Sequence, residues 1–384
     1  MGGRMQDEDG GPMNLQPLRG VRVLDFTVMP PGAYCTAMLA DLGAEVIRVE
    51  ARAQKGRRSL VLGRVALSKG KRSIALDLKN PAVNEILLRL AASADVVVEN
   101  ATPGAMESRG FGYSQAKKAN PAIIWCSITG FGQDGPSAVQ PGHDISYMAH
   151  SGMLAALARE LPWHPGMMLA VPTGGLMATI GIQSALLERN QSGRGCQIDI
   201  SLSESAMWVV AGTAGDLAQP PAAVPLGPDR RIYVCADGEM VAVAAAEPRT
   251  WSALCSGLGL PELIGALHVP ALAESTTEKL AAAFLTLSAR EWAERLGPLG
   301  AAVAPVNRGA QIINDPQVLA REAIVRVAEA QVAASPLRMT STDGARSTTA
   351  TAAPHLVGAD TCDLLYAAGF SQDEVKALEE AELI

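Results

Sequence analysis

The sequence has few aromatic residues and no excess of basic ones. Aromatic side chains make up 4% of the 384 residues, so alanine, valine and leucine must supply most of the core. Lysine and arginine number 32 against 39 aspartates and glutamates, a formal net charge of −7. Because binding to nucleic-acid phosphates needs a basic surface, this balance argues against nucleic acid as the main partner.

Metal-ligand motifs, disulfide motifs and long apolar runs are lacking too. No two of the six cysteines form a CxxC pair, and no histidine stands at metal-ligand spacing, so we expect free thiols and no metal. No uninterrupted apolar run reaches about 18 residues, which predicts no membrane span and a cytoplasmic protein. The start of the chain is rich in Gly, Asp and Met and lacks an apolar signal core, so residues 1–16 predict a flexible leader.

Strand and helix patterns alternate through the first half of the chain. Residues 21–26 predict a buried strand, residues 33–42 a helix that ends at Gly43, and residues 45–50 a second strand. The alternation continues with predicted strands and helices at 73–78, 81–93, 95–99, 114–119, 122–128, 175–190 and 197–201. Repeated strand–helix–strand units predict an α/β fold, a doubly wound parallel sheet.

The composition changes after residue 211. Gly, Pro and Ala dominate up to residue 229, which is typical of a linker. Two short strands around Asp237-Gly238 then predict a hairpin, followed by helical segments and a strand, at 231–236, 240–245, 247–257, 277–296 and 301–306. Residues 360–384 predict two amphipathic helices with Gly369 between them.

A glycine-rich loop and a basic patch are candidate ligand contacts. Residues 130–135 fit GxGxxG, but prolines interrupt the helix that a dinucleotide fingerprint requires, so Gly130 and Gly132 predict a loop whose backbone approaches a ligand. Lys71 and Arg72 directly precede a predicted strand. They suit a phosphate clamp by charge and donor geometry, and the alternative is a solvated turn.

Two residues are candidates for proton transfer. His143 follows a Pro-Gly turn and precedes Asp144, and imidazole is the side chain best suited to proton transfer near neutral pH. Glu247 ends a predicted apolar strand and precedes Pro248. A carboxylate there is well placed for chemistry, and the alternative is a charge that stabilises the start of a helix.

Several long motifs resemble the class III CoA-transferase family (CaiB/BaiF type). They occur in the family's order and read VRVLD at 21–25, LADLGAEVIRVE at 39–50, KRSIALDLK at 71–79, SITGFGQ at 127–133 and LER at 187–189 through GRG at 193–195. The likeness extends over roughly residues 17–384. It implies a Rossmann-like domain from both chain ends, at 17–210 and 325–384, with a smaller inserted α/β domain at 211–324.

The resemblance also implies partners and substrates. Family members form interlocked dimers, so a homodimer or a heterodimer with a homologous chain is expected, and the substrates are CoA thioesters. Contacts to CoA then fall on the Arg48 position and on the basic and glycine positions, Lys71, Arg72, Gly130 and Gly132.

The sequence is most similar to the α-methylacyl-CoA racemase branch. The segment from Gly142 to Tyr147 resembles that branch's histidine motif, and Ala246-Glu247-Pro248 resembles its glutamate motif. The resemblance implies that His143, Asp144 and Glu247 act on the α-proton of a 2-methylacyl-CoA. The reaction would pass through an enolate, whose oxygen backbone donors can stabilise.

The sequence departs from the family at the catalytic aspartate. The position of that residue falls on Val171 or Ala170, and neither side chain can accept a proton or attack a carbonyl. Thr102 also stands where the family's Asn-x-Arg-Pro-Gly turn has arginine. Glu160 or Asp216 could instead supply a carboxylate.

Three interpretations follow from this departure. The chain is an enzyme of altered chemistry that forms an enolate with His143 and Glu247, or it is the non-nucleophilic subunit of a heteromeric CoA-transferase. The third is a protein that binds acyl-CoA without turnover.

Overall fold

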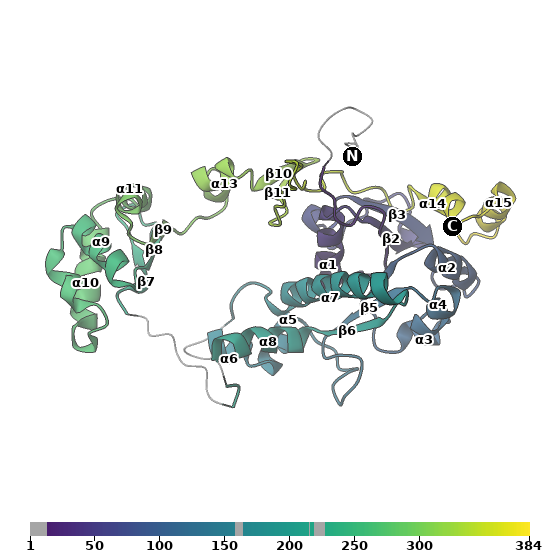
Figure 1. The fold of residues 1–384 in the computed structure, drawn as a ribbon, viewed down its shortest axis with the longest axis horizontal. Coiled ribbons are helices and arrows are strands. Elements are labelled where there is room, and N and C mark those ends of the chain that lie inside the picture. Colours follow the sequence, from purple (N-terminus) through teal and green to yellow (C-terminus); the bar gives the residue numbers. More distant parts are fainter. Residues whose placement is uncertain (1–13, 158–163, 215, 219–226) are drawn as a thin grey trace. The chain divides into compact units, whose positions relative to one another are not determined.

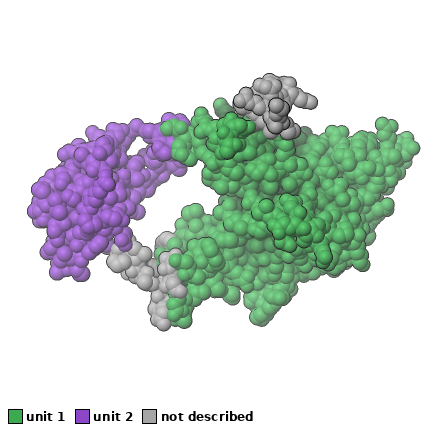
Figure 2. All heavy atoms as spheres, in the orientation of Figure 1, with its two compact units in different colours: residues 1–221, 320–384 green, residues 222–319 purple. Residues whose placement is uncertain are grey.

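The computed structural model describes residues 14–157, 164–214, 216–218 and 227–384 (Figure 1). Most of the predicted leader, part of the predicted linker and Glu160 lie outside these residues. The chain divides into two compact units (Figure 2). Unit 1 comprises residues 1–221 and 320–384, and unit 2 comprises residues 222–319. Unit 1 therefore draws on both ends of the chain.

Unit 1 is built on a six-stranded sheet in the order β3-β2-β1-β4-β5-β6. All neighbouring strands are parallel, which confirms the predicted parallel α/β sheet. The strands are β1 (Arg22–Asp25), β2 (Glu45–Ala51), β3 (Lys71–Leu76), β4 (Val96–Glu99), β5 (Ile124–Thr129) and β6 (Gln197–Ser201). The strand order reverses between β1 and β4, and sheets of this kind bind ligands beyond the carboxyl ends of their strands near such a point.

Helices cover both faces of the sheet (Figure 1). One face packs against α1 (Pro30–Asp41), α7 (Ala170–Ser192) and α8 (Leu202–Ala214). The other packs against α2 (Val83–Ala92), α4 (Tyr113–Ala119) and the C-terminal helices α14 (Thr361–Ala367) and α15 (Gln372–Glu380). Val98 faces the first layer and its neighbour Val97 the second, because successive strand side chains point to opposite faces. The C-terminal segment is thus part of the core of unit 1.

Two helices of unit 1 begin earlier than the sequence predicts. α1 begins at Pro30. Proline is tolerated in the first turn because the N–H that it lacks would have no partner within the helix there. α7 begins at Ala170, with Pro172 in its first turn for the same reason. Gly175 then lets α7 approach α1 closely, since a Cβ at this position would lie 2.7 Å from the carbonyl oxygen of Pro31.

Unit 2 contains a three-stranded antiparallel sheet of β7 (Arg230–Val234), β8 (Met240–Ala244) and β9 (Val303–Pro305). β7 and β8 form the predicted hairpin. The predicted helical segment at 277–296 is interrupted, because Ser288 caps a new helix by accepting a hydrogen bond from the Glu291 N–H. The helices are α9 (Pro248–Leu258), α10 (Ala273–Phe284) and α11 (Ala289–Leu296).

Besides five short 3-10 helices, the described part of the chain also contains shorter helices and a second hairpin. They are α3 (Ala105–Ser108), α5 (Asp144–His150), α6 (Met153–Leu157), α12 (Ala310–Ile313), α13 (Pro316–Ala320) and a hairpin of β10 (Ile324–Val327) and β11 (Ala330–Ala333). Among the described helices, α7 alone is long and apolar enough to cross a membrane. Half of its most apolar window is buried inside the protein, and a core helix of a globular domain meets the same criteria.

Candidate active site

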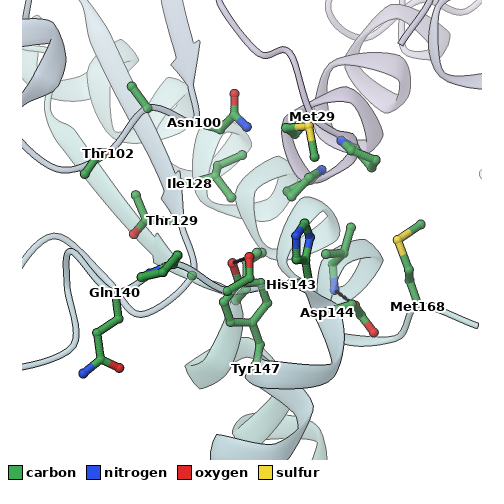
Figure 3. Close-up of a pocket in the computed structure, with 18 of the residues that line it drawn as sticks. Met29, Asn100, Thr102, Ile128, Thr129, Gln140, His143, Asp144, Tyr147 and Met168 are labelled. Carbon is green, nitrogen blue, oxygen red and sulfur yellow. Dashed lines mark hydrogen bonds between the residues drawn. The ribbon is translucent and has the colours of Figure 1, made fainter. Parts of the chain in front are cut away.

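A cavity of about 510 Å³ lies in unit 1 at the carboxyl ends of β4 and β5 (Figure 3). Its wall includes Asn100 directly after β4, Thr129 at the end of β5 and Met29 directly before α1. His143 and Val171 contribute to the wall from the starts of α5 and α7. Because doubly wound sheets bind ligands at this edge, the cavity is the candidate active site.

His143 is the residue directly before α5, and its side chain is exposed at the cavity (Figure 3). Its backbone N–H donates to the Ser146 hydroxyl at 3.4 Å, whereas its imidazole makes no hydrogen bond to the described residues. The ring nitrogens are therefore available to a ligand. Imidazole is the side chain that enzymes use most often as a general acid or base.

Asp144 connects the start of α5 to the start of α7. Its carboxylate accepts hydrogen bonds from the backbone N–H groups of Leu169 at 3.0 Å and Val171 at 2.7 Å. N–H groups in the first turn of a helix have no partner within the helix, and the helix dipole favours a negative charge there. These bonds fix the backbone beside His143 to the rigid helix α7.

The positions that the motif assigns to the catalytic aspartate lie in the first turn of α7. Val171 is 5% exposed and lines the cavity, and Ala170 is fully buried. Thr102, which stands at the arginine position of the turn motif, also lines the cavity. Val171 and Thr102 therefore lie in the wall of one cavity, and Ala170 lies next to it.

Two polar residues of the cavity wall were not singled out from the sequence. The Val28 N–H donates to Asn100 Oδ1 at 3.2 Å, which leaves the Asn100 amide N–H groups to point elsewhere. Thr129 is 7% exposed, and its hydroxyl is buried with no hydrogen-bond partner among the described residues. A buried, unpaired hydroxyl costs about 1–3 kcal/mol, so it is a candidate to bind a ligand. The position of both residues at strand ends was the signal that could have identified them.

Gly130 lines the cavity, as expected of a loop that approaches a ligand. A Cβ at this position would lie 2.3 Å from the ring of Tyr147, so glycine is required beside that ring. Burial, and then the charge of Asp144, raise the pKa of Tyr147, whose hydroxyl donates to the carbonyl oxygen of Gly142 at 2.7 Å. Gly132 has a φ of +94° and is not part of the cavity wall.

Lys71 lies inside unit 1. Its side chain is 1% exposed, and its Nζ lies 3.2 Å from Oδ2 of Asp25, which is itself fully buried. Burial opposes the ionisation of Asp25, but the charges of Lys71 and Arg48, together with hydrogen bonds from two threonine side chains, outweigh it. The pKa of Asp25 is therefore lowered. The ammonium of Lys71 therefore neutralises an interior carboxylate and is not exposed at the surface of this chain.

Arg48 and Arg72 also make ion pairs. Arg48 is buried, 3.1 Å from Oε1 of Glu50. Arg72 is partly exposed and pairs with Glu45 at 2.8 Å and with Asp360 at 3.3 Å. Neither arginine lines the cavity. Of the predicted CoA contacts, Gly130 is thus the one found in the cavity wall.

Glu247 belongs to unit 2, whereas every residue of the cavity wall belongs to unit 1. It directly precedes α9, and its Oε2 accepts a hydrogen bond from the Thr250 hydroxyl at 3.1 Å. Asp216, in unit 1, is not part of the wall. Among the residues that the structure describes, no group of three or more His, Cys, Asp or Glu could hold a metal ion.

The fold and the cavity define an α/β protein of the doubly wound class with a ligand site at the strand ends. The family model for CoA-transferase family III matches residues 18–361. The chain therefore belongs to CoA-transferase family III.

Similarity to individual proteins extends over nearly the whole chain. The chain is 34% identical to the alpha-methylacyl-CoA racemase of Mus musculus, covering 96% of this chain and 97% of the relative. It is 29% identical to the acetyl-CoA:oxalate CoA-transferase of Acetobacter aceti, and the match covers 85% of this chain and 90% of the relative. The crystal structure of a CAIB/BAIF family protein from Brucella suis superposes with a TM-score of 0.78 at 26% sequence identity. The match covers 92% of this chain and 100% of the Brucella chain. These similarities confirm the resemblance to the family and to its racemase branch.

Proposed function

We propose that this protein exchanges the α-proton of an acyl-CoA ester through an enolate, with His143 as the base. The proposal depends on one observation about His143. Its imidazole lines the cavity and makes no hydrogen bond to the described residues. A ring nitrogen takes the α-proton, and the C–H electron pair moves into the thioester to form the enolate. The imidazolium exchanges its N–H proton with solvent and then gives a proton back to the α-carbon.

Asn100 and Thr129 are proposed to stabilise the enolate oxygen. Asn100 accepts from Val28 through its oxygen, so its N–H groups can act as donors. The Thr129 hydroxyl has no partner among the described residues. Donors placed where negative charge develops are commonly the largest contribution to such a reaction. Asp144 is a positioning residue in this mechanism, because it fixes the backbone at His143.

The proposed reaction uses one face of the enolate. A racemase needs a proton carrier on each face, but Ala170 and Val171, at the position of the family's aspartate, cannot carry a proton. A single imidazole returns a proton to the face from which it removed one. We therefore expect solvent exchange with retention of configuration.

The experiment follows deuterium incorporation from D₂O into a 2-methylacyl-CoA of known configuration. Mass spectrometry measures exchange, and chiral analysis measures inversion. Incorporation that is lost in His143→Ala supports the proposal. Absence of incorporation despite measurable binding of the ester contradicts it.

A second candidate is the non-nucleophilic subunit of a heteromeric CoA-transferase. The absence of a carboxylate at Ala170 and Val171 and the transferase relatives favour it. Copurification of a homologous chain and CoA transfer only by the pair would support this candidate. Tight binding of acyl-CoA with neither activity would support a binding protein.

Several further properties belong to the proposal. We place the protein in the cytoplasm as a homodimer or a heterodimer with a homologous chain, acting on an acyl-CoA without a metal. Arg72 is the proposed contact to CoA phosphate among the predicted cations, because its side chain is 32% exposed.

A further inference from the structure

Arg64 carries the only fixed positive charge among the described residues that line the candidate active-site cavity. Its side chain is exposed, and its guanidinium makes no hydrogen bond or ion pair with the part of the chain that the structure describes. The other formally charged lining residue is Asp144, whose carboxylate accepts two backbone hydrogen bonds. Arg64 is therefore free to bind an anion that enters the cavity.

Arg64 ends a tight turn that begins at Val61. The Arg64 N–H donates to the Val61 carbonyl oxygen at 2.9 Å. Between them Leu62 has a φ of +47° and Gly63 a φ of +71°. A left-handed conformation costs a residue such as leucine roughly 1–2 kcal/mol, and such strain is concentrated at functional sites.

The turn is fixed to the body of unit 1. Ser68 is 1% exposed, and its hydroxyl accepts a hydrogen bond from the Val61 N–H and donates one to the Arg64 carbonyl oxygen, both at 2.9 Å. Val61 is buried against Ala33 of α1. One buried hydroxyl thus holds both ends of the turn, so the backbone that carries Arg64 is preorganised at the cavity.

We propose that Arg64 binds a carboxylate at the far end of the acyl group, so that the substrates are CoA esters of dicarboxylic acids. The inference rests on the proposed function, which places the thioester beside His143 in the same cavity. The CoA phosphates are separated from the thioester by the whole pantetheine arm, whereas the acyl chain begins at the thioester carbon. The planar guanidinium suits a carboxylate, because it can donate two parallel hydrogen bonds.

The rest of the cavity wall suits the methylene chain between the thioester and the carboxylate. Several of its residues have apolar side chains: Met29, Pro31, Leu62, Ile128, Val139 and Met168. Leu62 lies in the same turn as Arg64, so apolar surface and cation belong to one element. A dicarboxylic chain presents the same order, methylenes followed by an anion.

Binding of adipoyl-CoA, hexanoyl-CoA and free CoA to the full-length chain tests the inference by calorimetry. The two esters have acyl chains of equal length and differ in the terminal carboxylate. We expect adipoyl-CoA to bind about tenfold or more tightly than hexanoyl-CoA, because a charged hydrogen-bonded pair contributes that much. Arg64→Ala should remove this preference and leave the affinity for hexanoyl-CoA and CoA unchanged. Arg58 is an exposed cation of the same segment that lies outside the cavity wall, and Arg58→Ala should keep the preference for adipoyl-CoA.

Equal weakening of all three ligands by Arg64→Ala would assign Arg64 to a CoA phosphate and overturn the inference. Equal binding of the two esters to the unmodified chain would overturn it too. If hexanoyl-CoA still binds and exchanges its α-proton in either case, the proposed function stands without the inference. Failure of every ester to bind would overturn both.

Discussion

The carboxylate of Asp144 lies 2.7 Å from the backbone nitrogen of Val171. The first turn of α7 thus receives a negative charge from the first residue of α5. This contact holds the loop before α5, and with it His143, against α7. The site retains an anchored histidine although residues 170 and 171 are aliphatic.

Asp144→Asn is expected to lower the free energy of unfolding by about 1–2 kcal/mol, as for the loss of a helix-capping carboxylate. The two carboxylate oxygens of Asp144 accept one backbone N–H each. Asparagine has a single oxygen to accept with, and its NH₂ group would face the second backbone N–H. Urea unfolding measures the change. Asp134→Asn, an exposed aspartate of the preceding loop, is the control. Equal stability of the two variants would show that the contact is not significant.

Thr129→Val should separate stability from function. Valine has nearly the shape of threonine and suits a strand, so removal of the unpaired hydroxyl should raise the unfolding free energy by up to about 1 kcal/mol. Binding of acyl-CoA or its α-proton exchange should weaken severalfold at the same time. Thermal unfolding and kinetics measure the two effects, with Thr129→Ser as the variant that keeps the hydroxyl. Loss of stability with full activity would assign Thr129 to packing.

Lys71→Ala should lower the free energy of unfolding by about 3–5 kcal/mol, because it leaves the buried carboxylate of Asp25 without its cation. The exposed pair of Arg290 and Glu294, at 2.9 Å, is the comparison, and Arg290→Ala should change stability by less than about 1 kcal/mol. Chemical denaturation measures both. Similar values for the two variants would contradict an interior role for Lys71.

Asp360 should make stability depend on pH in the acid range. Burial opposes its ionisation, but the Ser73 N–H, His355 and Arg72 outweigh burial and lower the pKa of Asp360 below 3.8. The stabilisation is therefore complete above the unfolded pKa and is lost as the pH falls through the lower, folded pKa. The melting temperature of Asp360→Asn should lie below that of the unmodified chain at pH 6, and the difference should shrink below about pH 3.8. A constant difference across this range would contradict the assignment.

The sheet was predictable because its strands are short apolar runs between helices. The early starts of α1 and α7 were not, since prolines read as breaks unless their place in the first turn is known. The histidine and its aspartate could be found from their motif. Asn100 and Thr129 could be located by their place at strand ends. Arg64 could not, because its importance depends on which groups lack partners after folding.

The predicted CoA contacts illustrate the same limit. Lys71 and Arg48 are charged residues in a motif, and the sequence does not show that they face Asp25 and Glu50 inside the protein. A charged side chain in a strand is buried only where a partner of opposite charge meets it. That pairing joins segments far apart in the sequence.

The most direct test is the rate of α-deuterium incorporation relative to the rate of inversion for one enantiomer of a 2-methylacyl-CoA in D₂O. The account predicts that incorporation outpaces inversion by at least about tenfold, and that His143→Ala still binds the ester but no longer exchanges its α-proton. Inversion as fast as incorporation, or exchange that survives in His143→Ala, would contradict it.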